Sequence, residues 1–344
     1  MIQQARQSRV RDRLFRLAGV VVIITSFAGA WLIMDFQTFR KNPLPIPADG
    51  ATLMVEPGTN LKQIARQLQQ QSLLDKPTYL VLLGRYLGLD ARLKAGEFRL
   101  QAGINPEQLL EQLSGGQVIQ HNLTLIEGES FKEMMQRVAA DAALTHTLDN
   151  LSASKVMSAL GYPGLHPEGR FLPETYHFPR GTTDVDFLRR AYRAMGHFLQ
   201  SAWSGRDAGL PLQSPYEALI LASIVEKETA VPDERPRIAG VFIRRLQKGM
   251  KLQTDPTVIY GMGDQYQGDI RFRDLRTDTP YNTYTRSGLP PTPIAMPGKD
   301  ALLAVLHPAD GNALYFVARG DGSHHFSSTL KEHNRAVDRY QRKR

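Results

Sequence analysis

The sequence predicts an α+β protein with one N-terminal transmembrane helix, a small βααβ domain and a larger mixed α+β domain. Three observations support this prediction. An uncharged apolar run lies close to the N-terminus, short strand patterns alternate with Gly turns and helical patterns after it, and helical periodicity with Pro- and Gly-rich loops dominates the remainder. The length of 344 residues suits two or more folding units, and 42% apolar residues are sufficient for packed cores.

Composition and charge exclude several classes of chemistry. The chain has no cysteine, which rules out disulfides, Cys-ligated zinc, iron–sulfur clusters and thiol nucleophiles. The formal net charge is +8, but residues 1–16 hold five arginines and one aspartate, so half of the excess lies in a short basic tail before the apolar run. Because the positive charge is concentrated beside a membrane segment, we expect no nucleic-acid partner.

Residues 17–34, LAGVVVIITSFAGAWLIM, are predicted to form the transmembrane helix. An uncharged helix of eighteen residues is about 27 Å long, which is enough to cross the hydrocarbon core of a bilayer. The basic tail places the N-terminus in the cytoplasm by the positive-inside rule, so the chain after Asp35 would lie outside the cytoplasm in a single-pass inner-membrane protein. A cleaved signal peptide is the alternative, but the bulky, charged residues after Met34 provide no clear cleavage site.

Residues 35–50 are predicted to form a Pro-rich linker. They include NPLPIPADG, in which three prolines favour a stiff, extended chain. We expect this linker to hold the next domain away from the bilayer.

Residues 51–118 are predicted to form the small βααβ domain. A short alternating strand around Leu53 precedes a Gly turn and a helix capped by Thr59 or Asn60; after a second helix, a strand closes the unit near Phe98. This order resembles a LysM-like module, a small extracytoplasmic domain that binds N-acetyl sugars. The resemblance rests on a hydrophobic pattern, and a spacer domain without a ligand is the alternative.

The next region, residues 119–344, contains the segment that is most informative about chemistry. YEALILASIVEKE at 216–228 has no internal Gly or Pro and is predicted to be a helix. Glu228 continues an apolar stripe at helical spacing, which is formed by Ala218, Leu221, Ile224 and Val225. Glu226 falls on a different and more polar side of the helix. A carboxyl against apolar side chains has a raised pKa and can act as a general acid, so Glu228 is the candidate. The alternatives are the solvated end of a helix and an acceptor for a buried Arg.

Polar side chains gather after a second predicted helix at 238–246. The basic residues near its end are expected to face solvent, namely Arg244, Arg245 and Lys248. The segment KLQTDPTVIY at 251–260 is predicted to be extended and brings together three hydrogen-bonding side chains, those of Gln253, Thr254 and Asp255. Clustered amide, hydroxyl and aromatic groups suit carbohydrate recognition, whereas ordinary surface loops are the alternative.

Several long motifs resemble those of the endolytic murein transglycosylase family (YceG-like). They are RFLPETY at 170–176, ASIVEKET at 222–229, VFIRRLQKGMKLQTDPTVIYGMG at 241–263 and YNTYTRSGLPP at 281–291. The family's catalytic glutamate falls on Glu228, in agreement with the helical-face argument. The resemblance also assigns residues to the substrate cleft, namely Gln253, Thr254, Asp255, Asn282 and Tyr284.

The resemblance implies non-hydrolytic cleavage of the MurNAc-β-1,4-GlcNAc bond within peptidoglycan strands, with 1,6-anhydro ends. It also implies trimming or termination of nascent strands beside membrane-bound peptidoglycan synthases. We expect no cofactor and no metal site, because the histidines form no i, i+4 pair with a Glu base, and His324 and His325 are expected at the surface. The alternatives are a hydrolase whose second carboxylate is Asp255 or Glu174, and a non-enzymatic peptidoglycan-binding scaffold.

Overall fold

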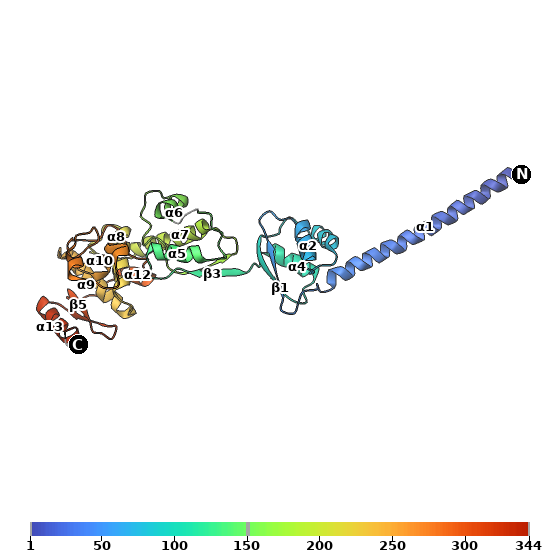
Figure 1. The fold of residues 1–344 in the computed structure, drawn as a ribbon. Coiled ribbons are helices and arrows are strands. Elements are labelled where there is room, and N and C mark those ends of the chain that lie inside the picture. Colours follow the sequence, from blue (N-terminus) through green and yellow to red (C-terminus); the bar gives the residue numbers. More distant parts are fainter. Residues whose placement is uncertain (1, 149–151, 343–344) are drawn as a thin grey trace. The chain divides into compact units, whose positions relative to one another are not determined.

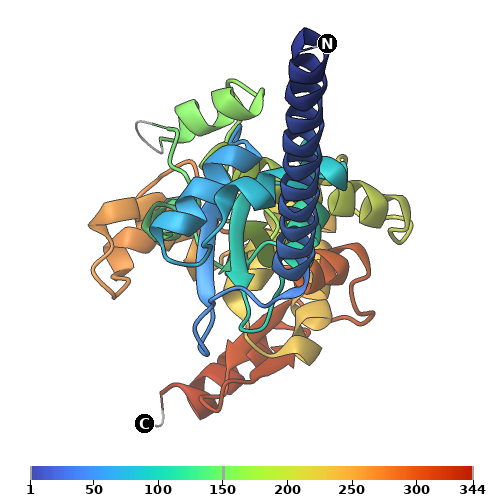
Figure 2. The same ribbon diagram turned by 90° about the vertical axis from the view of Figure 1, so that its right-hand side faces the viewer.

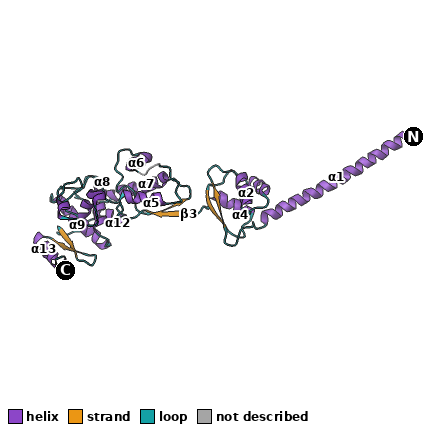
Figure 3. Cartoon of the chain, viewed as in Figure 1, coloured by secondary structure: helices purple, strands orange, loops and turns teal. Residues whose placement is uncertain are grey.

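The computed structural model describes residues 2–148 and 152–342, with side chains from residue 16 onward, and the chain divides into two compact units at residues 1–120 and 121–344 (Figure 1). The predicted α+β class is confirmed. The strands that the structure describes form two-stranded sheets among many helices (Figure 3). These strands are β1 (Ala51–Val55) with β2 (Gly96–Leu100), β3 (Gln120–Thr124) with β4 (Thr175–Pro179), and β5 (Tyr315–Ala318) with β6 (His324–Ser327).

The first unit begins with the long helix α1 (Ile2–Lys41). Within it, the segment Arg16–Lys41 is long and apolar enough to cross a membrane. Large apolar side chains of this segment are exposed, for example Val22, Phe27 and Trp31. An exposed apolar surface of this length is consistent with a membrane anchor.

The predicted linker at residues 35–50 is not a free spacer. Helix α1 continues to Lys41, and its last turns pack on the small domain. Asp35 accepts hydrogen bonds from Lys76 Nζ at 2.6 Å and Tyr79 Oη at 3.0 Å, and the Arg40 guanidinium grips Glu107 through two bonds of 2.8 and 2.9 Å. After the helix, Leu44 and Ile46 are buried in the core of the unit. Apolar residues between the prolines therefore tie this segment to the domain.

The small domain follows the predicted βααβ order, with α2 (Leu61–Gln70) and α3 (Pro77–Tyr86) between antiparallel strands β1 and β2. Leu53 lies opposite Phe98, and both side chains are fully buried. Helix α4 (Pro106–Gly115) completes the unit. Asn60 caps α2 through a reciprocal capping box with Gln63. The likeness to LysM and the binding of sugar stay predictions.

The second unit is mostly helical. Its α-helices are α5 (Phe131–Ala140), α6 (Ala153–Leu160), α7 (Asp184–Ser204), α8 (Pro215–Glu228), α9 (Arg235–Gln247), α10 (Asp255–Met262), α11 (Phe272–Arg276), α12 (Lys299–Leu306) and α13 (Leu330–Tyr340), and its 3₁₀ turns are η1 (Pro232–Glu234) and η2 (Gly263–Gln265). The hairpin β5–β6 lies beside α13 at the C-terminal end of this unit (Figure 2).

Helix α8 is the central element of the second unit. It contacts α7, α9, α10 and α12, and every residue from 218 to 225 is buried. The prediction that Glu226 lies on a more polar face of this helix is therefore wrong, because neighbouring elements cover the helix on all sides. The Pro-rich loop at residues 292–298 is also buried rather than a surface loop, and Ile294 N donates a hydrogen bond of 2.9 Å to Ser223 Oγ.

Two other local predictions fail. The segment 251–260 is extended only to Thr254, because α10 begins at Asp255 with Pro256 in its first turn, where a missing N–H costs nothing. Arg245 is buried rather than solvent-facing, and its guanidinium donates to the carbonyl oxygens of Leu314 at 2.7 Å and Leu252 at 2.8 Å. Backbone carbonyls of distant segments thus satisfy this charge.

Candidate active site

Glu228 lies where two cavities of the second unit meet. The first cavity, of about 850 Å³, is lined by residues 124–129, 173–175, 226–230 and others. The second cavity, of about 570 Å³, is lined by residues of the 252–255 segment, the β5–β6 hairpin and α13. Glu228 lines both, because it ends α8 at the point where the helix emerges from the core.

The Glu228 carboxyl is partly buried and has a hydroxyl partner. Thr254 Oγ1 donates a hydrogen bond of 2.8 Å to Glu228 Oε2. Burial raises the pKa of Glu228 to about 7, while the Thr254 hydrogen bond opposes this increase. In the part of the chain that the structure describes, Glu228 forms no ion pair. A carboxyl of this kind retains its proton close to neutral pH and can donate it.

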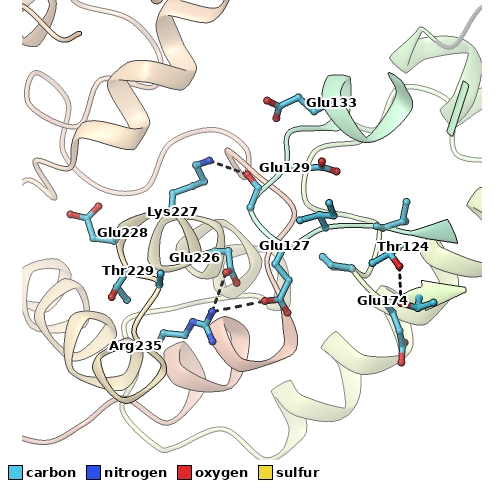
Figure 4. Close-up of a pocket in the computed structure, with 16 residues that line it drawn as sticks. Thr124, Glu127, Glu129, Glu133, Glu174, Glu226, Lys227, Glu228, Thr229 and Arg235 are labelled. Carbon is cyan, nitrogen blue, oxygen red and sulfur yellow. Dashed lines mark hydrogen bonds and ion pairs between the residues drawn. The ribbon is translucent and has the colours of Figure 1, made fainter. Parts of the chain in front are cut away.

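Glu226, two residues earlier, is held differently. Its side chain is only 6% exposed and accepts hydrogen bonds from Arg235 at 3.3 Å and from Gly298 N at 2.9 Å. Burial raises the pKa of Glu226, and the Arg235 guanidinium opposes the shift. Arg235 also lies 3.9 Å from Glu127, and Figure 4 shows both carboxylates turned toward this cation while Glu228 points away from it. Both oxygens of Glu226 are thus occupied by structural partners.

A second carboxyl with a raised pKa lies elsewhere in this unit. Glu168 is 3% exposed, and burial raises its pKa to about 7. One oxygen accepts a hydrogen bond from Phe131 N at 2.8 Å and the other from Tyr260 Oη at 2.9 Å. Because both oxygens are engaged in joining α5 to α10, this carboxyl has a structural role.

Threonine side chains hold the segment that carries Thr254. Thr254 N donates to Thr283 Oγ1 at 3.1 Å, and the hydroxyl of Thr257 bonds both Thr254 O at 2.7 Å and Thr283 Oγ1 at 2.8 Å. Gln253 has a φ of +51°, a left-handed conformation that is unusual for a residue with a side chain. Such strain persists only where the surroundings enforce it. Here the bonds to Thr283 and Thr257 hold the segment from which Thr254 Oγ1 donates to Glu228.

Four of the predicted site residues gather around the second cavity, and Thr254 contacts one of them. Glu228, Gln253, Asp255 and Tyr284 line it. Tyr284 Oη donates a hydrogen bond of 2.5 Å to Asp255 Oδ1, and burial, followed by this bond, raises the pKa of Tyr284. The cavity thus presents an amide, a carboxylate and a phenol close to the Glu228 carboxyl.

The sixth predicted residue, Asn282, lies away from both cavities. It is fully buried, and its amide nitrogen donates to the carbonyl oxygens of Asp274, Leu275 and Thr277. Its Oδ1 accepts a hydrogen bond from Tyr284 N at 2.8 Å. Asn282 therefore shapes the loop that presents Tyr284, and its position does not support direct contact with a substrate.

Sequence reasoning missed a carboxylate–imidazole pair whose histidine, His324, lines the second cavity. Glu234 accepts hydrogen bonds from His324 N at 2.8 Å and from His324 Nδ1 at 2.7 Å. The prediction that His324 lies at the surface is wrong, since its side chain is 12% exposed. Alternation along a strand offered a signal, because His324 and His325 must face opposite sides.

Two of the remaining acidic groups of the first cavity are paired with bases, whereas Glu133 accepts hydrogen bonds from Ser130 N and Oγ. Glu174 lies 3.5 Å from Lys299 Nζ, and Glu129 forms an ion pair with Arg137. Across residues 16–148 and 152–342, no group of three His, Asp or Glu side chains is arranged to hold a metal ion.

Comparison with known proteins places this geometry in a family context. The profile of the YceG-like family matches residues 53–339. A Bacillus subtilis protein named endolytic murein transglycosylase is 28% identical over 317 residues, which are 86% of this chain and 87% of that protein. A Streptococcus pneumoniae protein of the same name is 27% identical and is matched over 94% of this chain but 64% of its own length. The crystal structure of a YceG-like protein from Listeria monocytogenes, 27% identical, matches with a TM-score of 0.54 over 84% of this chain and 99% of that one.

Proposed function

The chain belongs to the YceG-like family and is a lytic transglycosylase, and from this premise we propose that Glu228 is the acid with which it cleaves the MurNAc-β-1,4-GlcNAc bond. One observation carries the assignment. Glu228 is a partly buried carboxyl at the junction of two cavities, with a hydroxyl partner, no ion pair among the described residues and a pKa raised to about 7.

One group is sufficient for the reaction, because the same carboxyl can first give and then take a proton. Protonated Glu228 donates to the glycosidic oxygen as the bond to C1 breaks, and the sugar ring becomes oxocarbenium-like. The MurNAc 6-hydroxyl then attacks C1, and its proton can return to the Glu228 carboxylate, so the product has a 1,6-anhydro end. Two-carboxylate glycosidases differ because their second carboxylate activates water or attacks the sugar.

The two cavities support an internal cut rather than an end-directed one. A strand bound across Glu228 would extend into the first cavity on one side and into the second on the other. In the second cavity, Gln253, Asp255 and Tyr284 offer hydrogen bonds to sugar hydroxyl and N-acetyl groups. Hydrogen bonds of this kind would also orient the reacting ring.

The hydrolase alternative needs a free second carboxylate, and neither candidate suits that role. Glu174 lies beside Lys299 at 3.5 Å, and Asp255 Oδ1 accepts the 2.5 Å hydrogen bond of Tyr284. The scaffold alternative does not explain Glu228, a carboxyl that retains its proton and forms no ion pair among the described residues.

The apolar segment of α1 supports a further part of the proposal. We infer that it anchors the chain in the inner membrane, with the basic tail in the cytoplasm and the second unit outside. An enzyme held there could trim or terminate nascent strands beside membrane-bound peptidoglycan synthases. Sugar binding by the LysM-like first unit belongs to the same proposal.

Mass spectrometry of products tests the function directly. The full chain in detergent micelles is incubated with purified peptidoglycan strands, together with Glu228→Gln and, as a matched control on the same helix turn, Glu226→Gln. We expect internal fragments whose ends are one water lighter than hydrolysed ends, no fragments from Glu228→Gln, and fragments from Glu226→Gln. Ends of hydrolysed mass would establish the hydrolase instead, and binding without fragments would establish the scaffold.

A further inference from the structure

A second proton-transfer group lies in the same cavity as Glu228. His324, at the start of β6, and Glu228, at the end of α8, both line the second cavity. Nothing in the mechanism above uses this histidine.

Glu234 fixes the imidazole in one orientation. One carboxylate oxygen accepts the His324 backbone N–H at 2.8 Å and the other accepts ring Nδ1 at 2.7 Å, so the main chain and the side chain are gripped by one group. Both side chains are nearly covered, at 9% exposure for Glu234 and 12% for His324. Phe316 packs edge-on against the ring at 5.4 Å. These contacts leave the ring no freedom to turn over.

This orientation also fixes the hydrogen-bonding character of the ring. Because Nδ1 donates to a carboxylate, the neutral imidazole carries its hydrogen on Nδ1 and a lone pair on Nε2. Among the described residues, no donor or acceptor bonds Nε2. A carboxylate on one ring nitrogen and an open second nitrogen is the arrangement by which enzymes prepare a general base.

From this geometry we propose that His324 is a second catalytic residue, whose Nε2 takes the proton of the attacking MurNAc 6-hydroxyl while Glu228 protonates the leaving oxygen. The inference rests on the proposed function of Glu228. The C1–O4 bond breaks and the C1–O6 bond forms; O4 receives the proton of Glu228, and Nε2 receives the proton of O6. The products of this step are a Glu228 carboxylate and a His324 imidazolium in one cavity, and a proton transfer through water returns both to their starting forms.

Two substitutions separate catalysis from structural support. In His324→Asn, the amide N–H can still donate to Glu234 in place of Nδ1, but no atom occupies the Nε2 position. In His324→Gln, the amide reaches toward the Nε2 position and the Nδ1 donor is lost. We expect His324→Asn to lower kcat by about 100-fold with little change in KM, because a general base contributes on the order of 10²–10⁴ in rate. If His324 only supports Glu234, the Asn variant stays within about twofold of wild type and the Gln variant is the impaired one, which would overturn the proposal.

Chemical rescue provides a readout that a structural role would not move. His324→Gly opens a ring-sized space beside Glu234, and added imidazole should restore kcat in proportion to its concentration. His325→Asn is the matched control, since the neighbouring ring faces Tyr340 at 5.7 Å and lies outside the cavity; it should retain wild-type kcat. Thermal unfolding verifies that the His324→Gly protein is folded. If the folded variant shows no increase in kcat with imidazole, the proposal is contradicted.

Glu228→Gln distinguishes the two hypotheses. If Glu228→Gln is inactive and is not rescued by imidazole while His324→Asn is active, the proposed function of Glu228 stands and the role of His324 as a base is rejected. An active Glu228→Gln would remove the proposed function itself.

Discussion

The two cavities that meet at Glu228 hold their carboxylates in different ways. Three acidic groups of the first cavity have cationic partners: Glu226 binds Arg235, Glu129 binds Arg137 and Glu174 binds Lys299. Hydroxyl groups are the partners of Glu228, which lines both cavities, and of Asp255 in the second, because Thr254 donates to Glu228 and Tyr284 donates to Asp255. A cation favours the ionised carboxylate much more strongly than a hydroxyl does. Burial raises the pKa of both Glu228 and Glu226, and the two carboxyls differ in the partner that opposes this rise, a hydroxyl for Glu228 and a guanidinium for Glu226.

The largest expected effect comes from removing the proton that the Glu228 carboxyl retains. Glu228→Gln should lower kcat by about 10³-fold or more, because the loss of a general acid costs on the order of 10²–10⁴. Release of anhydro ends from purified strands measures it. In wild type, the same assay should show activity falling as pH rises through about 7, where the Glu228 carboxyl ionises. A flat profile between pH 6 and 8 would break the comparison.

Glu228 should make the stability of the fold decrease as pH rises, which is the opposite of the effect of an acidic residue whose pKa is lowered by folding. The pKa of Glu228 is about 7 in the folded protein against 4.5 for an ordinary Glu. The folded state therefore holds a proton that the unfolded state has lost, and its stability falls as pH rises from about 4.5 to 7. Glu228→Gln does not pay this penalty, so it should gain about 2–3 kcal/mol over wild type between pH 5 and pH 8. Urea unfolding of both proteins at the two pH values tests this, and equal stability differences would contradict it.

Glu226→Gln should show the reverse pattern, with activity kept and stability lost. The substitution leaves the Arg235 side chain, which is 11% exposed, without its nearest carboxylate. Asp300 at 3.6 Å and Glu127 at 3.9 Å remain beside this cation, so we expect the free energy of unfolding to fall by about 1 kcal/mol, the usual contribution of one hydrogen bond. The remaining kcat should lie within about tenfold of wild type, since Glu226 does not face the reacting bond in our assignment. A loss of activity as large as that of Glu228→Gln would show that the roles were assigned to the wrong carboxyl.

The smallest effect should come from the hydroxyl partner. Thr254→Val removes the hydrogen bond that favours ionised Glu228, so the pKa of Glu228 should rise further. The alkaline limb of the activity profile should then move to higher pH, while kcat at acidic pH changes little. Thr257→Val, within the same threonine cluster but without contact to Glu228, controls for local packing. A shift toward lower pH would contradict the role given to Thr254.

The central helix and its terminal carboxyl could be predicted because their signals are local. Pro215 at the first turn and an uninterrupted helical pattern define α8, and Glu228 follows from its end. The different environments of the two glutamates could not be predicted. An apolar stripe cannot reveal that Glu226 contacts Arg235 and a backbone N–H, because those partners come from α9 and from the loop before α12.

The misses concern contacts between distant segments. Glu234 and His324 are separated by 90 positions, and no periodicity links them. The sequence pattern predicts a solvent-facing Arg245, because a sequence does not show which backbone carbonyl oxygens, such as that of Leu314, will accept its hydrogen bonds. Pro256 is compatible with an extended segment and equally with the first turn of a helix, so the residue type alone does not decide between them.

The docking of α1 onto its neighbouring domain has a mechanical consequence. Asp35 and Arg40 are clamped to α3 and α4, and the rings of Phe36 and Phe39 meet Tyr79 edge-on at 5.6 Å. If α1 is the membrane anchor that we propose, the anchor has no joint at the bilayer surface. A tilt of the helix within the lipid would then be passed on as a rigid rotation of the first unit, so membrane thickness and curvature would act on this protein as on a lever.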